Sequence, residues 1–162
     1  MHMRLFLKRN TFDDSCCFTI FDEKEETKYV ACHASSKLIA RHRLTIADST
    51  GEIVAKIRRL PLVGTDTYVL KFQKKHVTFV TLPAPNGSRS FFYGSNWRVA
   101  GEILSKNFSI IDVDKTLILE HRKHADYCEL LIPDERNELF CVAASVCVNL
   151  FNTIESPALQ AV

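Results

Sequence analysis

The sequence predicts a mainly β (α+β) fold in which a closed antiparallel sheet surrounds one buried hydrophobic C-terminal helix. Residues 139–151 are almost wholly apolar, whereas the rest of the chain reads as short strands separated by turns. A helix that is apolar on every side must be covered on every side. At ~1.5 Å per residue this segment spans roughly 20 Å, which is shorter than a ~30 Å hydrocarbon core. We therefore expect the covering layer to be the protein's own sheet.

Three predicted strands end in an aspartate and lead through a short polar turn into a second strand. A carboxylate at this position can accept a hydrogen bond from a backbone N–H two residues further on, which stabilises the turn. We therefore interpret Asp22, Asp48 and Asp112 as turn formers, with paired catalytic carboxylates as the alternative. The strand pairs are residues 18–22 with 29–32, 44–48 with 53–59, and 108–112 with 117–119.

Period-two alternation or extended character predicts further strands at residues 68–75, 76–82, 91–93, 97–101 and 127–132. The proline- and glycine-containing stretch 82–88 is expected to be a long loop. It is not a domain boundary, because neither half of the chain alone supplies a closed core. The chain is thus predicted to be a single domain, residues 1–162, with its core at about 3–154.

The helix is expected to begin near residues 133–138, with Asp134 or Asn137 as the N-cap. It is expected to end near residues 152–156, before Pro157. Asn149 is the one strongly polar residue in the apolar run, and a buried amide needs hydrogen-bond partners. We expect it to bond a strand end and not a ligand.

Composition indicates a soluble globular protein, with 46% hydrophobic and 25% charged residues and a net charge of +2. Basic residues outnumber acidic ones in residues 1–81, and the reverse holds in residues 82–162. Residues 1–9 contain no apolar run of signal-peptide length. We therefore expect a cytoplasmic protein, peripheral at a membrane if it binds one, whose six cysteines stay reduced.

The order of several motifs resembles the LURP-one-related proteins, relatives of the tubby C-terminal domain and the phospholipid scramblases. The motifs are FTIFD at 18–22, LTIADSTGEIVAKI at 44–57, SNWRVAGEI at 95–103, FSIID at 108–112 and YCELLIPDE at 127–135. The resemblance covers roughly residues 3–154 and implies a twelve-stranded β-barrel threaded by the helix. Tubby domains bind phosphoinositide headgroups and scramblases act at membranes. Neither a tubby lipid-binding motif nor the scramblase cysteine-rich and calcium-site segments map onto this chain, so the resemblance is a guide to fold.

The candidate binding site is a basic hairpin formed by residues 53–59 and 68–75. Alternation places Lys56, Arg58, Lys71 and Lys75 on its outer face, with Arg59 and Lys74 at the strand ends or on a bulge. Such a cluster can hold a phosphate headgroup through charge-assisted hydrogen bonds or attract an anionic membrane. The alternative is a solubilising strand edge. The apolar loop 60–64 would dip into a membrane interface or cap the barrel end.

Other chemistries find little support in the sequence. Two groupings could supply metal ligands: His121, His124 and Cys128, or Cys16, Cys17, Cys32 and His33. Paired C-x2-C knuckles, which are typical of structural zinc sites, are absent, so we expect no metal or other cofactor. No nucleophile-elbow, P-loop or dinucleotide motif occurs, and we expect no catalytic residues and no enzyme. Residues 91–93 beside Arg89 and Arg98 are the candidate for nucleic acid, although barrel aromatics usually pack in the core, and no nucleic-acid partner is expected.

The leading functional hypothesis is a non-enzymatic module that binds anionic phospholipid or a membrane surface through the basic hairpin. One alternative is a protein-interaction scaffold with no lipid role, which implies protein partners. Another is a barrel-type carrier of a small ligand, which requires a cavity where the helix is expected to be. A fourth, insertion of the helix into a membrane, requires residues 139–151 to leave the barrel.

Overall fold

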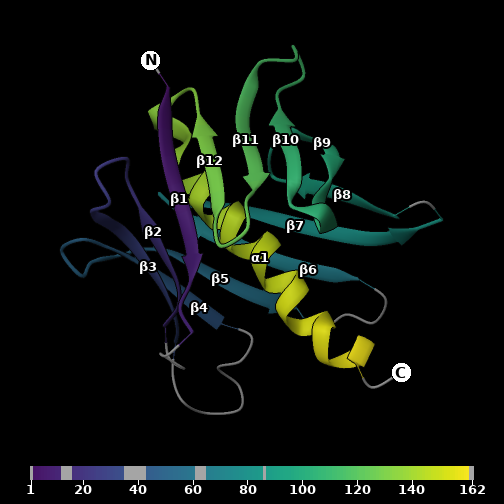
Figure 1. The fold of residues 1–162 in the computed structure, drawn as a ribbon. Coiled ribbons are helices and arrows are strands. Elements are labelled where there is room, and N and C mark those ends of the chain that lie inside the picture. The colour runs from purple at the N-terminus through teal and green to yellow at the C-terminus, as the bar shows by residue number, and fades with distance from the viewer. Residues whose placement is uncertain (1, 12–15, 35–42, 61–64, 86, 161–162) are drawn as a thin grey trace.

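The computed structural model describes residues 2–11, 16–34, 43–60, 65–85 and 87–160, with side chains described as far as residue 150. The architecture is a closed antiparallel barrel of twelve strands with one helix through its centre (Figure 1). The strand order is β1-β12-β11-β10-β9-β8-β7-β6-β5-β4-β3-β2, so that β1 closes the barrel by pairing with both β2 and β12. The fold class predicted from the sequence is therefore confirmed.

The strands follow one another around the barrel as a meander. Their bounds are β1 (Met3–Arg9), β2 (Cys16–Phe21), β3 (Thr27–His33), β4 (Arg43–Asp48), β5 (Ile53–Leu60), β6 (Asp66–Phe72), β7 (Lys75–Ala84), β8 (Gly87–Tyr93), β9 (Arg98–Glu102), β10 (Asn107–Ile111), β11 (Leu117–Lys123) and β12 (Cys128–Ile132). A short 3-10 turn, η2 (Ile103–Ser105), links β9 to β10, and a second, η3 (Glu135–Asn137), precedes the helix α1 (Glu138–Gln160).

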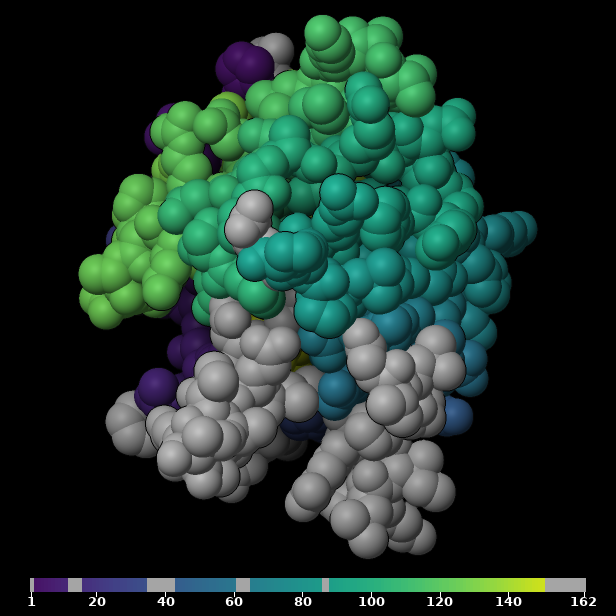
Figure 2. Space-filling view, turned by 90° about the vertical axis from the view of Figure 1, so that its right-hand side faces the viewer, coloured from purple at the N-terminus to yellow at the C-terminus, as the bar shows by residue number. Residues whose placement is uncertain are grey.

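The core is the space between the inner faces of the strands and the helix. Inward side chains such as Ile20, Ile46 and Leu70 are fully buried and alternate with outward polar ones. The helix from Phe140 to Val148 is buried on all sides. In Figure 2 the strands cover the described helix almost completely on the face that is shown. No helix among the described residues combines the length and the apolarity needed to cross a bilayer.

The three aspartate turns share one geometry, which confirms their predicted role. In each hairpin the aspartate N–H donates to the carbonyl four residues on, and its carbonyl accepts from the residue three on. That residue has positive φ: Glu25, Gly51 or Lys115. The carboxylates of Asp22 and Asp48 accept from backbone N–H groups two residues on, at 2.8 and 2.9 Å, whereas Asp112 accepts from Val113 at 2.6 Å. This hydrogen-bond pattern, with positive φ at the third loop residue, matches a common three-residue hairpin connection.

Several predicted boundaries are wrong, and each error has a local cause. β1 was not predicted, because its apolar core Leu5–Phe6–Leu7 is only three residues long. The predicted strand at 68–75 ends at Phe72, since Gln73 and Lys74 both adopt positive φ and form a two-residue turn. Residues 82–88 are not a long loop: β7 and β8 pair as far as Ala84 and Gly87, and residue 86 lies outside the described residues. The helix continues past Pro157 to Gln160, because a proline removes one backbone hydrogen bond without necessarily ending a helix.

Hydrogen bonds and an ion pair fix the N-terminal end of the helix. Asp134, one of the two predicted N-caps, caps the preceding 3-10 turn by accepting a hydrogen bond from the Arg136 N–H at 3.0 Å. The Glu138 carboxylate accepts from the Tyr29 hydroxyl and pairs with Lys28 Nζ at 2.9 Å. Burial, and then the Glu138 carboxylate, raise the pKa of Tyr29. Two residues of β3 therefore hold the first turn of α1.

A buried histidine connects β11 to the middle of the helix. His121 Nδ1 lies 2.7 Å from the Lys106 carbonyl oxygen, and Nε2 lies 2.8 Å from Ser145 Oγ. Because a carbonyl can only accept, Nδ1 carries the proton and Nε2 accepts from the serine hydroxyl. Burial lowers the pKa of His121 to about 4. The imidazole is thus neutral in the folded protein at neutral pH.

Asn149 and Cys128 form a long hydrogen bond between the helix and β12. The Asn149 amide donates to the Ser145 carbonyl at 2.8 Å and accepts from the Cys128 thiol at 3.6 Å. Cys128 is the first residue of β12, so the predicted bond from Asn149 to a strand end is present.

The expectation that all six cysteines are reduced is wrong. Cys16 and Cys32 form a disulfide, because they lie opposite each other on the paired strands β2 and β3. Their separation in sequence gives no sign of this register. The cysteines outside the disulfide are Cys17, which is partly buried, and Cys128, Cys141 and Cys147, which are buried.

The stability of the fold should depend on pH through His121. In the unfolded chain its pKa is close to 6.5, but in the barrel it is about 4. Stability is therefore complete above pH 6.5 and is lost as the pH falls towards 4, by about 3 kcal/mol if only this group is counted. Urea unfolding between pH 7.5 and 4.5 measures it. His121→Asn should lower stability at neutral pH and flatten the acid slope, whereas His76→Asn on the exposed outer face should leave the slope unchanged. Equal slopes in all three proteins would contradict this assignment.

The disulfide should be visible in a thiol titration. Protein purified without reductant and unfolded in guanidinium should react at four thiols, and reduced protein at all six. A cross-link that closes a loop of about 15 residues contributes about 3 kcal/mol, so reduction should lower the melting temperature. Cys16→Ser with Cys32→Ser should melt with the reduced protein. Six reactive thiols before reduction would rule out the cross-link.

Candidate functional site

The outer face of β4, β5 and β6 carries four basic side chains in two cross-strand pairs. Lys56 of β5 lies opposite Lys71 of β6, and Arg58 of β5 lies opposite Arg43 of β4. All four are exposed, because the residues that alternate with them, such as Ala55 and Ile57, point into the core. The three strands lie side by side on the wall of the barrel (Figure 1). We call these four residues the basic face.

The basic face is slightly hollowed. A shallow depression of about 300 Å³ is lined by all four basic side chains, with Thr45 and Val69 among the residues between them. Directly opposed residues have Cβ atoms roughly 4.5–5.5 Å apart. Two long cationic side chains at this spacing can both reach one phosphate group, with bidentate donation from the arginines.

The described neighbours of the basic face do not neutralise its charges. Among the described residues, none of its four side chains forms an ion pair with a carboxylate. Like charges placed directly opposite each other across a sheet are destabilising. An anion in the depression would relieve this repulsion.

Three of the predicted site residues lie elsewhere. Arg59 belongs to the opposite side of β5, where its guanidinium pairs with Asp66 at 3.2 Å. Lys74 sits in the β6–β7 turn, and Lys75 begins β7 opposite Phe72. The turn reverses the chain two residues earlier than predicted, so the outer-face neighbour of Lys71 is His76 and not Lys75. Of the predicted apolar loop, residues 61–64 lie outside the described residues.

Arg43 was not predicted as a site residue. The predicted strand began at Leu44, one residue too late. Extending the alternation of Leu44 and Ile46 by one residue would have placed Arg43 on the outer face beside Arg58.

Of the two predicted metal-ligand groupings, Cys16, Cys17, Cys32 and His33 lie together, but Cys16 and Cys32 are bonded to each other, and Cys17 Sγ lies 3.8 Å from His33 Nε2. The members of the other grouping have separate surroundings. His121 is buried and hydrogen-bonded, His124 stacks on Tyr127 at 4.7 Å, and Cys128 bonds Asn149. No group of three His, Cys, Asp or Glu side chains within the described ranges is arranged to hold a metal. The Ser145–His121 pair resembles a nucleophile with its base, but both residues are buried, at 0% and 1% exposure, and the barrel wall separates them from any substrate.

The aromatic candidate for nucleic acid divides between the two faces of β8. Phe92 points inward and stacks on Phe79 at 4.7 Å, whereas Phe91 and Tyr93 point outward and are 42% and 63% exposed. A groove of about 550 Å³ between β8 and β9 includes Phe91, Arg89 and Arg98. Backbone pairing between β8 and β9 is limited to one residue pair, Phe91 with Arg98. Further along the two strands, the Glu102 carboxylate accepts hydrogen bonds from the backbone N–H and the hydroxyl of Ser88.

Comparison with known proteins identifies the family. A family model described as LURP-one-related matches residues 3–149, and the chain belongs to this family. An X-ray structure of a protein from Arabidopsis thaliana is similar in fold, with a TM-score of 0.61 and 11% sequence identity over 92% of this chain and 91% of that chain. No curated protein matches the chain at a significant level.

Removing one charge from an opposed pair should stabilise the barrel. Lys56→Gln should raise the free energy of unfolding by less than about 1 kcal/mol at low ionic strength, because it removes repulsion from Lys71. The gain should shrink as salt screens the charges. Urea unfolding at low and high salt measures both effects. Lys115→Gln, in a turn, is the control and should give no such gain; a salt-independent gain for Lys56→Gln would show that charge repulsion is not its cause.

Proposed function

We propose that this LURP-one-related barrel is a non-enzymatic module that binds anionic phospholipid headgroups through the basic face. The observation that carries the proposal is the pairing of four exposed cations around one depression, without carboxylate partners among the described residues. Family membership supports a tubby-like barrel, whereas the ligand is argued from the side chains alone.

The electrostatics favour an extended anionic surface over a single small anion. Each basic residue close to an anionic membrane contributes about 1 kcal/mol, so four act together at about 4 kcal/mol. The depression lies on the outer face of the barrel among exposed side chains, which suits a headgroup presented by a bilayer. Attraction through exposed charges requires no rearrangement of the barrel and weakens as salt is added.

The alternative functions differ in what supports them. A carrier needs an empty interior, but the helix from Phe140 to Val148 fills it. Insertion of the helix would expose these same buried residues and break the bonds of Ser145 and Glu138 to the strands. A protein-interaction role is favoured by a separate groove that is described below. The cytoplasmic location stays a prediction, and the Cys16–Cys32 disulfide counts against a strongly reducing compartment.

Sedimentation with vesicles tests the proposal. The vesicles are phosphatidylcholine alone, or phosphatidylcholine mixed with phosphatidylserine or with a phosphatidylinositol bisphosphate, at low and moderate salt. The wild-type protein should bind both anionic mixtures and be released by salt. Lys56→Gln, Arg58→Gln and Lys71→Gln together should weaken binding about 100-fold, since each removes about 1 kcal/mol.

The control removes the same charge elsewhere. Lys24→Gln, Lys115→Gln and Lys123→Gln also lower the net charge by three, but these residues lie away from the basic face. This variant should retain most of the binding. Equal losses in both triple variants would show that net charge and not the basic face is responsible, and the absence of wild-type binding to any anionic vesicle would end the lipid proposal.

A further inference from the structure

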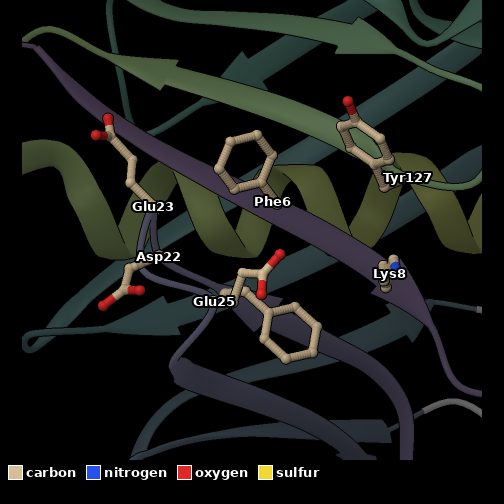
Figure 3. A pocket seen from close by; sticks show the side chains of 7 residues that line it. Phe6, Lys8, Asp22, Glu23, Glu25 and Tyr127 are labelled. Carbon is tan, nitrogen blue, oxygen red and sulfur yellow. The ribbon is translucent and has the colours of Figure 1, made fainter.

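A second groove, of about 580 Å³, lies on the outer wall where β1, β2 and β12 meet (Figure 3). Its floor is aromatic and consists of Phe6, Phe21 and Tyr127. Phe6 and Phe21 are cross-strand partners, and the Tyr127 ring meets Phe6 edge-on at 5.7 Å. Figure 3 shows Phe6 and Tyr127 side by side, with Glu23 towards one end of the groove and Lys8 towards the other.

These rings are not part of the core. Leu5 and Leu7 point inward and are 1% and 2% exposed, so Phe6 between them points outward. None of the three rings belongs to the hydrophobic core described around the helix. Outward positions on a barrel strand face water and are usually polar. Three neighbouring half-buried rings there indicate a surface for which apolar contact is useful.

The rim of the groove is acidic. Asp22, Glu23 and Glu25 line it, against the single amine of Lys8. The Asp22 carboxylate is accounted for by its turn, since it accepts from the N–H groups of Lys24 and Glu26. Glu23 and Glu25 are exposed and have no ion-pair partner in the described part of the chain.

Turn geometry does not require a glutamate at position 25. Glu25 adopts φ +62°, and the equivalent residues of the other two aspartate turns are Gly51 and Lys115. The same backbone therefore accepts a residue with no side chain or one of opposite charge. The side chain of Glu25 is one of those that line the groove (Figure 3).

We propose that this groove binds an extended segment of a partner protein that carries arginine or lysine next to apolar side chains. The ring faces attract a cation, Glu23 and Glu25 pair with it, and the remaining aromatic surface takes the apolar neighbours. A volume of about 580 Å³ is within the usual range for a binding pocket. The acidic rim repels an anionic membrane, so the groove and the basic face serve different ligands, and this proposal does not rest on the lipid proposal.

A peptide titration tests the proposal. The probe is a blocked peptide of alternating arginine and leucine, compared with its glutamate–leucine counterpart, and binding is followed by fluorescence anisotropy and by amide shifts in nuclear magnetic resonance. The arginine peptide should bind with shifts centred on β1, β2 and residue 127, and the glutamate peptide should not bind. Glu23→Gln with Glu25→Gln should weaken binding about 10-fold, and Tyr127→Leu should weaken it about 3-fold.

The matched control is Glu52→Gln with Glu135→Gln, which removes two exposed carboxylates outside the groove. It should bind like the wild type. Equal weakening in both double variants, shifts centred elsewhere, or no binding by the wild type would each overturn the proposal. Vesicles of phosphatidylcholine provide a second arm, because their zwitterionic headgroup ends in a quaternary ammonium cation: binding to them that depends on Glu23 and Glu25 would replace the peptide with a lipid.

Discussion

The structure depends on one constraint: a helix that is apolar on every side has to be enclosed. Phe140 to Val148 have almost no exposed surface, and a closed sheet can cover a helix in this way without leaving an edge. The polar side chains Ser145 and Glu138 of the helix are consistent with enclosure, because each bonds a strand residue. Ser145 bonds His121 of β11, and Glu138 bonds Tyr29 of β3, so hydrogen bonds as well as apolar contacts hold the helix in one position.

Enclosure also determines where function can lie. Among the described residues the helix from Phe140 to Val148 is buried against the strands, and buried Ser145 and His121 stabilise the fold in spite of their reactive side-chain types. The binding proposals therefore concern the outer wall. Two described parts of the wall carry the binding proposals: the basic face on β4, β5 and β6, and the acidic aromatic groove on β1, β2 and the residue before β12. They differ in charge, and β3 separates them along the shorter path around the barrel.

Sequence patterns predicted what depends on neighbours along the chain. Alternation placed Lys56, Arg58 and Lys71 on one face, and the aspartate turns were evident from their local chemistry. The errors have another origin. Gln73 and Lys74 both have positive φ, but neither is a glycine, so the sequence contained no residue typical of a turn at this point. The disulfide and the groove depend on register and closure: Phe6, Phe21 and Tyr127 are distant in sequence and meet because β1 lies between β2 and β12.

The groove lies at the point where the barrel closes, and this position has a thermodynamic consequence. β1 joins the first hairpin to β12, so the floor of the groove exists only when the first and last strands are paired. A partner that contacts Phe6, Phe21 and Tyr127 together recognises the closed barrel and not the open chain. Its binding free energy then adds to the stability of closure, by mass action. Because β1 both closes the barrel around the helix and contributes to the groove, binding at the groove would stabilise the enclosure of the helix.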